Sequence, residues 1–323
     1  MTLFCLSDLF SGHAKGFFYL RSYLECRKGK WRLGEKKQAL NIVKMKKMKA
    51  EGVPLSMLTA YDYPSAQLAE EAGIDIILVG DSLGNVVLGY DSTLPVTIDD
   101  MVYHTRSVAR GAGHTFIVAD LPFMTYHGGI DETLRNVRRL MQEGHAHAVK
   151  MEGGAEIAET VSKIVAAGVP VLGHIGLTPQ SVHTIGGYRV QGKDEADARR
   201  LLDDALALEA AGAFGIVLEL VTEEVAELIS RRLSIPTIGI GAGRGCDGQV
   251  LVFHDLLKYT SSYREKRFVK TYADVGGMIR EGISAYVKEV KDRSFPAEQH
   301  VFGADADVVG SLYGHEDKGE TSR

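Results

Sequence analysis

Short apolar runs alternate with amphipathic stretches along most of the chain. Eight of these runs are brief, rich in aliphatic residues and bounded by turn residues, which is typical of buried strands. The runs lie at residues 55–62, 75–81, 115–123, 147–153, 170–176, 215–220, 236–243 and 249–255. Helical spacing is found between them, at residues 64–73, 97–112, 131–144, 154–168, 194–212 and 222–233. Several of these helical stretches end in a glycine suited to a left-handed C-cap.

This order of elements predicts an α/β protein with a parallel sheet. Strands that are apolar throughout need helices over the sheet, and eight such units in about 250 residues favour a (β/α)8 TIM barrel. An open doubly wound sheet is the alternative, in which polar residues would gather at one switch point. Here polar residues follow several strands, as the active face of a barrel requires. We therefore predict a single-domain TIM barrel over residues 41–302.

The two ends of the chain differ from the barrel pattern. Residues 1–40 hold many aromatic and basic residues and the only tryptophan, and their basic residues follow the apolar stretch, which argues against a signal peptide. Three explanations are open for these residues: a docking segment, an organelle-targeting leader, or upstream sequence read through from a mistaken start. We favour the last. We interpret these residues as an extension outside the core. Residues 303–323 are polar and glycine-rich, which predicts a disordered C-terminal tail.

The composition narrows the class of function. With 323 residues, a formal net charge of -5 and a pI near 6.1, the chain carries no basic footprint for nucleic acid. No window approaches the roughly 18 apolar residues that cross a bilayer, so we expect no membrane partner. Cys5, Cys26 and Cys246 are odd in number and lack a CxxC spacing, which suits a reducing compartment and a cytoplasmic location. We interpret the three thiols as non-catalytic and expect small-molecule chemistry.

Polar and ionisable residues stand at the ends of five predicted strands. They are Asp81 and Ser82 after the second run, Asp120 in the third, Lys150 and Glu152 in the fourth, His174 in the fifth and Glu219 in the sixth. Carboxylates from separate strands repel one another unless a hard cation lies between them, and oxygen ligands suit Mg²⁺. Asp81 and Asp120 could instead cap loops or helices. With Glu152 at the equivalent place, we predict a divalent metal site formed by all three carboxylates.

Three of these residues also suggest roles in substrate chemistry. Lys150 lies two residues before Glu152, so both side chains share one face of the strand, either as a structural ion pair or to hold an anionic substrate beside the metal. Glu219 has aliphatic neighbours, and partial burial makes a carboxylate a better proton acceptor; a satisfied core carboxylate is the alternative. His174 could bind metal, contact substrate or fill the barrel, and we favour the substrate contact. His254 and Asp255 close the last run without an assigned role.

Two glycine-containing segments follow predicted strands. The sequence GIGAGRG after the seventh run is not a dinucleotide fingerprint, because Arg244 and Cys246 stand where the third glycine is needed. These glycines permit close approach of the backbone to a ligand, or a tight turn. Residues 177–193 exceed the usual length of a loop after a barrel strand and contain a Gly-Gly pair. We predict that they form a lid, with a disordered insertion as the alternative.

Several motifs, in this order, resemble the ketopantoate hydroxymethyltransferase family. They are LTAYDYPSAQ, LVGDSLGNVVLGYDSTLPVT, ADLPFMTY, VKMEGG, GHIGLTPQSV, GGYRVQG, DALALEAAGA and IGIGAGRGCDGQVLVFHD. The resemblance runs from about Leu40 to Phe302, and the two ends of the chain lie outside it. It implies a (β/α)8 barrel related to the phosphoenolpyruvate/pyruvate enzymes and a homo-oligomer, often a decamer.

The resemblance also implies a reaction. The family uses Mg²⁺ and 5,10-methylenetetrahydrofolate to hydroxymethylate 3-methyl-2-oxobutanoate, giving ketopantoate on the route to pantothenate and coenzyme A, through an enolate that the metal stabilises. By position, the implied roles are metal binding for Asp81 and Asp120, with Glu152 acting largely through water, oxo-acid binding for Ser82 and Lys150 with the two aspartates, and proton acceptance for Glu219. Two rivals remain: a lyase or phosphonate mutase of the same superfamily that works without folate, and a non-enzymatic ligand-binding barrel.

Overall fold

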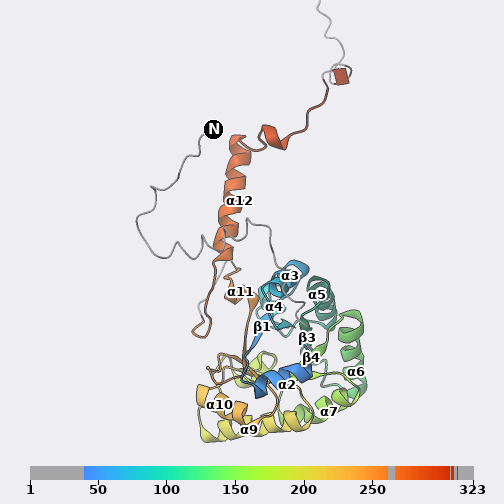
Figure 1. Cartoon of the computed structure of the whole chain (residues 1–323), viewed down its shortest axis with the longest axis vertical. Coiled ribbons are helices and arrows are strands. Elements are labelled where there is room, and N and C mark those ends of the chain that lie inside the picture. Colours follow the sequence, from blue (N-terminus) through green and yellow to red (C-terminus); the bar gives the residue numbers. More distant parts are fainter. Residues whose placement is uncertain (1–39, 261–265, 306, 309–310, 312–323) are drawn as a thin grey trace, which may run out of the picture. The chain divides into compact units, whose positions relative to one another are not determined.

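The computed structural model describes residues 40–260, 266–305, 307–308 and 311. Eight parallel strands pair in chain order, and the last pairs with the first, so the sheet closes into a barrel (Figure 1). The strands are β1 (Leu55–Thr59), β2 (Ile76–Val79), β3 (Phe116–Asp120), β4 (Ala148–Glu152), β5 (Val171–Gly176), β6 (Gly215–Glu219), β7 (Thr237–Ile240) and β8 (Gly248–Leu251). The predicted strands and the predicted (β/α)8 barrel are confirmed.

Six long helices form a ring around the strands in Figure 1, at the places where the sequence predicts them. They are α3 (Tyr63–Glu71), α5 (Ile98–Gly111), α6 (Ile130–Arg138), α7 (Ala158–Ala166), α9 (Glu195–Ala210) and α10 (Glu223–Arg232). The predicted helix over residues 131–144 is α6 continued by a π-helical turn, Arg139–Glu143. Gly73, Gly168 and Gly212 follow α3, α7 and α9 in the left-handed conformation, which confirms their role as C-caps.

Alternation along the strands separates two layers of core. Leu58 and Ile77 point outward and pack with residues of the surrounding helices, whereas Met57, Leu78 and Val118 belong to a second cluster that fills the barrel interior. Side chains two residues apart on a strand share a face, so Asp120 continues the interior row of Val118. The polar strand ends therefore point into the mouth of the barrel.

The sequence analysis missed several short helices and two longer ones, α2 (Ile42–Ala50) and α12 (Val275–Asp292). In α2, which precedes β1, lysine is the commonest residue and Met45 alone is buried, so its sequence shows little apolar periodicity. Met45 packs with Leu55 and Met57 in the interior cluster. In α12, which follows the barrel, most residues are exposed. The predicted extension over residues 1–40 and most of the predicted tail over residues 303–323 lie outside the described residues.

The last predicted run needs a correction. Strand β8 ends at Leu251, and the next residues form the short helix α11 (Phe253–Leu256), so His254 and Asp255 lie on a helix and not on a strand. The chain turns because the backbone N–H of Phe253 donates to Thr59 Oγ1, at 2.9 Å, which ties it to the end of β1. An apolar run that continues into a helix cannot be divided by periodicity alone.

The segment 177–193 is ordered and carries its own turns. A 3-10 turn, Pro179–Ser181, leads into the short helix α8 (Val182–Ile185), which ends at Gly186 in the left-handed conformation. Further on, the backbone N–H of Gln191 donates to the carbonyl of Leu220 at 2.7 Å. The disordered insertion is therefore excluded, and the segment is tied to the residue after β6.

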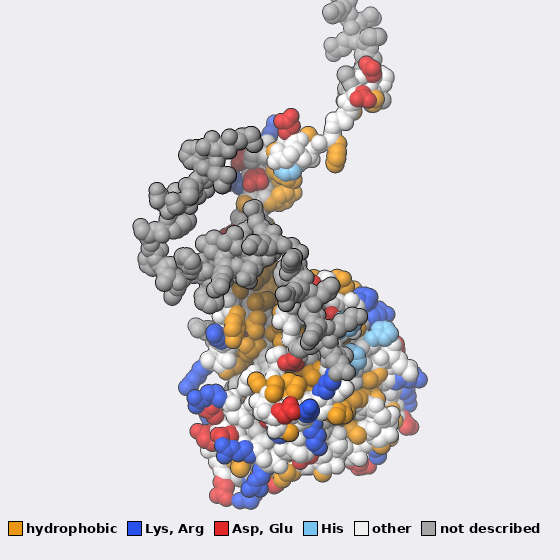
Figure 2. Space-filling view, in the orientation of Figure 1, with side chains coloured by type: hydrophobic (Ala, Val, Ile, Leu, Met, Phe, Trp, Pro, Cys, Tyr) orange, Lys and Arg blue, Asp and Glu red, His pale blue; other side chains and the backbone are white. Residues whose placement is uncertain are grey.

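The exterior of the barrel carries charges of both signs. Figure 2 shows lysine and arginine side chains intermingled with aspartate and glutamate over the visible face of the barrel. Most ion pairs there are solvent-exposed, as in Lys163 with Glu159 at 2.7 Å and Arg199 with Glu195 at 3.2 Å. Among the described residues, the helices are all too short or too polar to span a bilayer.

Candidate active site

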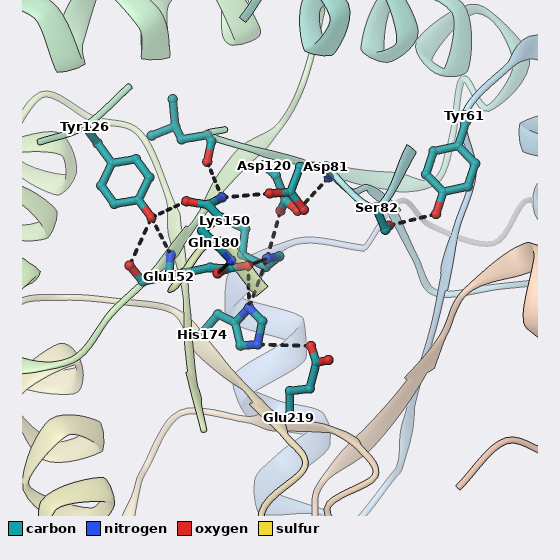
Figure 3. A network of polar contacts seen from close by, with 11 residues as sticks. Tyr61, Asp81, Ser82, Asp120, Tyr126, Lys150, Glu152, His174, Gln180 and Glu219 are labelled. Atoms are coloured by element: carbon teal, nitrogen blue, oxygen red, sulfur yellow. Dashed lines mark hydrogen bonds and ion pairs between the residues drawn. The ribbon is translucent and has the colours of Figure 1, made fainter. Parts of the chain in front are cut away.

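The carboxyl ends of the strands bring the predicted residues together in one polar cluster, drawn in Figure 3. Five of its ionisable side chains are at most 5% exposed, and Glu219 is partly exposed. The five are Asp81, Asp120, Lys150, Glu152 and His174. Such groups are seldom buried unless they are paired or bind a ligand. The cluster lines a cavity of about 140 Å³ at the centre of the barrel mouth, which also contacts Ser82 and Glu219.

Asp81 and Asp120 are neighbours at the ends of β2 and β3. The backbone N–H of Asp81 donates to Asp120 Oδ2 at 3.0 Å. Burial raises the pKa of Asp81 well above its usual range, and the charges of Asp120 and Glu152 raise it further. Burial also raises the pKa of Asp120, although nearby Lys150 works against this. The fold thus holds two carboxylates where their charged forms are disfavoured unless a cation is near.

Lys150 supplies one positive charge within this cluster. Its Nζ atom lies 3.1 Å from Asp120 Oδ1 and 3.9 Å from Glu152 Oε1. Burial alone would lower its pKa, but the charges of Asp120, Glu152 and Asp81 outweigh burial and raise the pKa above its ordinary value. Lys150 therefore remains a cation, and the alternation argument that placed it on the same face as Glu152 is confirmed.

His174 lies between two glutamates. Its Nδ1 atom is 3.3 Å from Glu152 Oε1, and its Nε2 atom is 3.3 Å from Glu219 Oε2. Burial and the nearby Lys150 charge lower its pKa, but the two glutamates outweigh them and raise it to about 9. The raised pKa favours the protonated imidazole at neutral pH, while Lys150 Nζ, 3.2 Å from Nδ1, opposes it. The charge of His174 also contributes to lowering the pKa of Glu152, against the effect of burial.

Ser82 stands at the edge of the cluster, at the start of the short helix α4 (Leu83–Val86). Its Oγ atom lies 2.9 Å from the hydroxyl of Tyr61, which is buried and follows β1. Burial raises the pKa of Tyr61, so this hydroxyl stays protonated. The sequence analysis did not single out Tyr61, although its position two residues after a strand is the signal that identified Asp81.

Two further residues of the cluster were missed. Gln180 and Tyr126 are buried and lie 2.7 Å apart, from Gln180 Oε1 to the Tyr126 hydroxyl. Gln180 also donates to Asp81 and to Glu152 (Figure 3). Neither residue ends a strand, so the rule that located the other residues could not find them.

His254 and Asp255 are not part of the cluster drawn in Figure 3. His254 stacks on Tyr259, with ring centroids 5.0 Å apart, and lines a separate cavity beside Tyr61. Asp255 pairs with Lys266, at 2.6 Å, on the rim of the central cavity. The thiol of Cys246, which the sequence analysis interprets as non-catalytic, is partly buried, and burial raises its pKa and favours the unreactive neutral form.

The donor set at the centre was tested for a divalent cation. No three His, Cys, Asp or Glu side chains among the described residues are arranged so that they could jointly hold a metal ion. Mg²⁺, however, is commonly held by one or two carboxylates, with waters and substrate in its other positions. The cluster has four carboxylates against the two basic side chains Lys150 and His174, and the buried Asp120 Oδ1 faces Lys150 Nζ at 3.1 Å. The carboxylates of Asp81 and Asp120, in a cluster with more acidic than basic side chains, therefore fit a divalent cation.

A second cavity adjoins the cluster. It has a volume of about 330 Å³ and shares Ser82 and Glu219 with the central cavity. Its walls are mostly apolar and include two aromatic side chains, Tyr188 and Phe268, with Asn85 and Lys266 as polar groups. Seven of its nine lining residues, Tyr188 and Phe268 among them, also line the central cavity, so the two cavities are parts of one continuous site.

The sequence of this chain matches one family of enzymes over most of its length. The family model described as ketopantoate hydroxymethyltransferase matches residues 39–298. The 3-methyl-2-oxobutanoate hydroxymethyltransferase of Bacillus cereus is 58% identical over 268 residues, covering 83% of this chain and 96% of that protein. The enzyme of the same name from Shouchella clausii is 56% identical over 273 residues, covering 84% and 98%.

Solved structures agree on the fold. A 2,3-dimethylmalate lyase, described as a member of the PEP mutase/isocitrate lyase superfamily, is 16% identical with a TM-score of 0.51, over 85% of this chain and 95% of that one. At this identity the likeness concerns the barrel alone. The family match and the high identity to curated enzymes carry the assignment. This chain is an enzyme that belongs to the ketopantoate hydroxymethyltransferase family.

Proposed function

We propose that this enzyme transfers a hydroxymethyl group from 5,10-methylenetetrahydrofolate to 3-methyl-2-oxobutanoate, giving ketopantoate. Family membership supports the reaction. The structural observation that carries the proposal is the position of Glu219, which lies 3.3 Å from His174 in the charged cluster and also lines the adjoining apolar cavity. A base at this place can reach an oxo acid on one side and a one-carbon donor on the other.

Asp81 and Asp120 are the residues that would hold Mg²⁺, with Glu152 acting through water. Burial raises the pKa of both aspartates in the protein alone, and a bound cation would favour their charged forms. When bound, the metal would polarise the keto oxygen of the substrate and stabilise negative charge that develops beside it. Water and the oxo acid would fill the remaining coordination positions of the metal.

Lys150 and Ser82 are the groups that would hold the oxo acid. The ammonium of Lys150 is buried and charged, so it attracts a substrate carboxylate. The Ser82 hydroxyl can donate to a second substrate oxygen, while the Tyr61 hydroxyl 2.9 Å away fixes its orientation. Together these groups would turn the branched carbon of the substrate toward Glu219.

Glu219 would accept the proton from the carbon next to the keto group. That carbon then forms the new carbon–carbon bond to the one-carbon unit, and both bonds from that unit to folate nitrogens break. One water supplies the hydroxyl group, and the two nitrogens take up the proton held by Glu219 and the remaining proton of the water. The charged imidazole of His174, 3.3 Å from Glu219, holds the base in place. Removal of a well-placed base costs about 10²- to 10⁴-fold in rate.

The apolar cavity of about 330 Å³ is the place we assign to the folate ring. Tyr188 and Phe268 offer aromatic faces for a flat heterocycle, and Asn85 offers hydrogen bonds to its edge. Tyr188 belongs to the segment 177–193, so this segment, predicted as a lid, would cover the reacting atoms from one side.

We also propose that the enzyme is cytoplasmic and assembles as a homo-oligomer. Helix α12 supports the second statement, because it exposes a row of apolar side chains that a single copy leaves in water: Met278, Ile279, Ile283, Tyr286, Val287 and Val290. An exposed stripe of this kind marks an interaction surface. A decamer is the size that the family suggests, and light scattering measures it directly.

The reaction is tested by assaying tetrahydrofolate formation from methylenetetrahydrofolate and 3-methyl-2-oxobutanoate, with and without EDTA. We expect turnover with Mg²⁺ and loss of turnover with EDTA. Omission of the folate is the control for a lyase or mutase. Turnover of the oxo acid without folate would contradict the proposal, and so would the absence of tetrahydrofolate from a metal-loaded, folded enzyme.

A further inference from the structure

One residue outside the strands contacts the acidic groups of two different strand ends. Gln180, in the turn Pro179–Ser181, donates from Nε2 to Asp81 Oδ2 at 2.8 Å, and its backbone N–H donates to Glu152 Oε2 at 3.0 Å. Its side chain is buried. Figure 3 shows these contacts at the centre of the polar network. The segment after β5 thus contacts carboxylates at the ends of β2 and β4.

The chemistry of the amide fixes its orientation. Nε2 has two hydrogens and faces two acceptors, Asp81 Oδ2 and the carbonyl of Leu121 at 3.0 Å. Oε1 faces the Tyr126 hydroxyl at 2.7 Å, and that hydroxyl also lies 3.0 Å from the carbonyl of Glu152. A rotation of the amide by half a turn would set an oxygen against a carboxylate and a carbonyl. A glutamine in this orientation therefore satisfies each polar atom of its side chain.

Gln180 contacts one oxygen of each of two carboxylates. It donates to Oδ2 of Asp81 and to Oε2 of Glu152, whereas Oε1 of Glu152 faces His174 and Lys150. A hydrogen bond to one oxygen of a carboxylate restrains the direction of the other. Residues that orient metal ligands in this way change metal affinity about 10- to 100-fold when they are lost.

We propose that Gln180 is a positioning residue that orients the carboxylates of Asp81 and Glu152 for divalent cation binding. It does so only while the segment 177–193 is folded onto the barrel, so cation binding and the folding of this segment favour each other. This inference rests on the proposed function, because it takes Asp81 as a metal ligand. It adds a residue that neither ends a strand nor touches the cation.

The test compares the full-length Gln180→Met and Gln191→Met variants. Methionine keeps the length of glutamine and the backbone N–H that donates to Glu152, but it removes the side-chain hydrogen bond to Asp81. Gln191 is a matched control in the same segment, and its side chain donates to the carbonyl of Arg189. Mn²⁺ binding is measured by the electron paramagnetic resonance signal of the free ion. We expect Gln180→Met to weaken Mn²⁺ binding about 10- to 100-fold and Gln191→Met to leave it within about twofold.

A merely structural role predicts a different result. It would lower the melting temperature of Gln180→Met but leave the Mn²⁺ affinity of the folded protein unchanged, and this outcome overturns the proposal. If Gln180→Met does not fold, Tyr126→Phe replaces it, because it removes only the hydroxyl that contacts Gln180 Oε1. We then expect Mn²⁺ binding about 3- to 10-fold weaker. Unchanged affinity in that variant also overturns the proposal.

The result is separable from the test of the reaction. If the wild type binds Mn²⁺ but forms no tetrahydrofolate, the proposed function fails while the role of Gln180 is still measured. If the wild type forms tetrahydrofolate and Gln180→Met retains full Mn²⁺ affinity, the role of Gln180 fails alone. A wild type that binds no Mn²⁺ overturns this inference.

Discussion

The Nε2 atom of His174 lies 3.3 Å from Oε2 of Glu219, and this contact joins the proposed base to the buried charges of the barrel mouth. The other imidazole nitrogen faces Glu152, so a single side chain links Glu219, the proposed base, to the proposed metal site. A proton gained by Glu219 therefore changes the charge balance of the whole cluster.

Replacement of the base tests its role without removing the site. Glu219→Gln keeps the shape of the side chain but cannot accept a proton, so metal and oxo acid should still bind. We expect exchange of the branched-carbon proton with D₂O, followed by NMR with Mg²⁺ and without folate, to slow by about 10²- to 10⁴-fold. Glu224→Gln, on the exposed side of α10, is the matched control. Equal exchange in both variants would move the base to another residue, with His174 the first candidate.

The two aspartates provide a test of metal binding. Asp81→Asn and Asp120→Asn each remove one negative charge from the proposed ligand set, and we expect Mg²⁺ affinity by calorimetry to fall at least about tenfold. Because folding raises the pKa of Asp81, its charged form is disfavoured, and Asp81→Asn should not lower the melting temperature of the metal-free protein. Asp203→Asn, at an exposed position of α9, serves as the control. Unaltered Mg²⁺ affinity in both site variants would remove this assignment.

Lys150 gives a test of stability. Lys150→Met takes the cation away from Asp120 and Glu152 and leaves both carboxylates buried without it. The loss of one partner from a buried pair costs about 3–5 kcal/mol, and we expect this fall in the free energy of unfolding by urea denaturation of the metal-free protein. Lys163→Met, which removes an exposed pair with Glu159, should cost at most about 1 kcal/mol. Equal costs in the two variants would show that burial of the pair is unimportant.

The raised pKa of His174 predicts a pH dependence. The folded protein binds the proton more tightly than the unfolded chain, with a pKa of about 9 against 6.5. The stabilisation is therefore complete below pH 6.5 and is lost as the pH rises through 9. Urea unfolding in EDTA should show this decline in the wild type and a flatter profile in His174→Gln. His114→Gln, at an exposed position, should keep the wild-type slope, and a His174→Gln profile as steep as the wild type would refute the assignment.

The start of the barrel unit predicts the effect of truncation. A chain that begins at Leu40 keeps α2 and its N-cap, Asn41, whose side chain accepts from the backbone N–H of Lys44 at 2.9 Å. A chain that begins at Met45 loses this cap and the first turn of α2. We expect the longer form to fold and turn over, and the shorter form to be less stable by about 1 kcal/mol or more in urea denaturation. Loss of activity in the longer form would make residues 1–39 part of the working enzyme.

Most of the fold and about two thirds of the cluster could be predicted from the sequence. Asp81, Asp120, Lys150, Glu152, His174 and Glu219 were found because each stands at the end of an apolar run, and the ends of parallel strands meet at one edge of a barrel. Helix α12 was not predicted, because a helix with little buried surface lacks the clear separation of apolar and polar faces that a barrel helix shows.

Local spacing determined the number and order of the strands and the faces of their end residues, since alternation acts over two residues and needs no knowledge of the rest of the chain. Only the tertiary structure decided which other groups reach those residues. Gln180 contacts Asp81 across 99 positions of sequence, and Tyr126 contacts Gln180 across 54. It also decided that the pKa of His174 is raised, because that shift depends on burial, on Lys150 and on carboxylates from two other strands, which no spacing rule can measure.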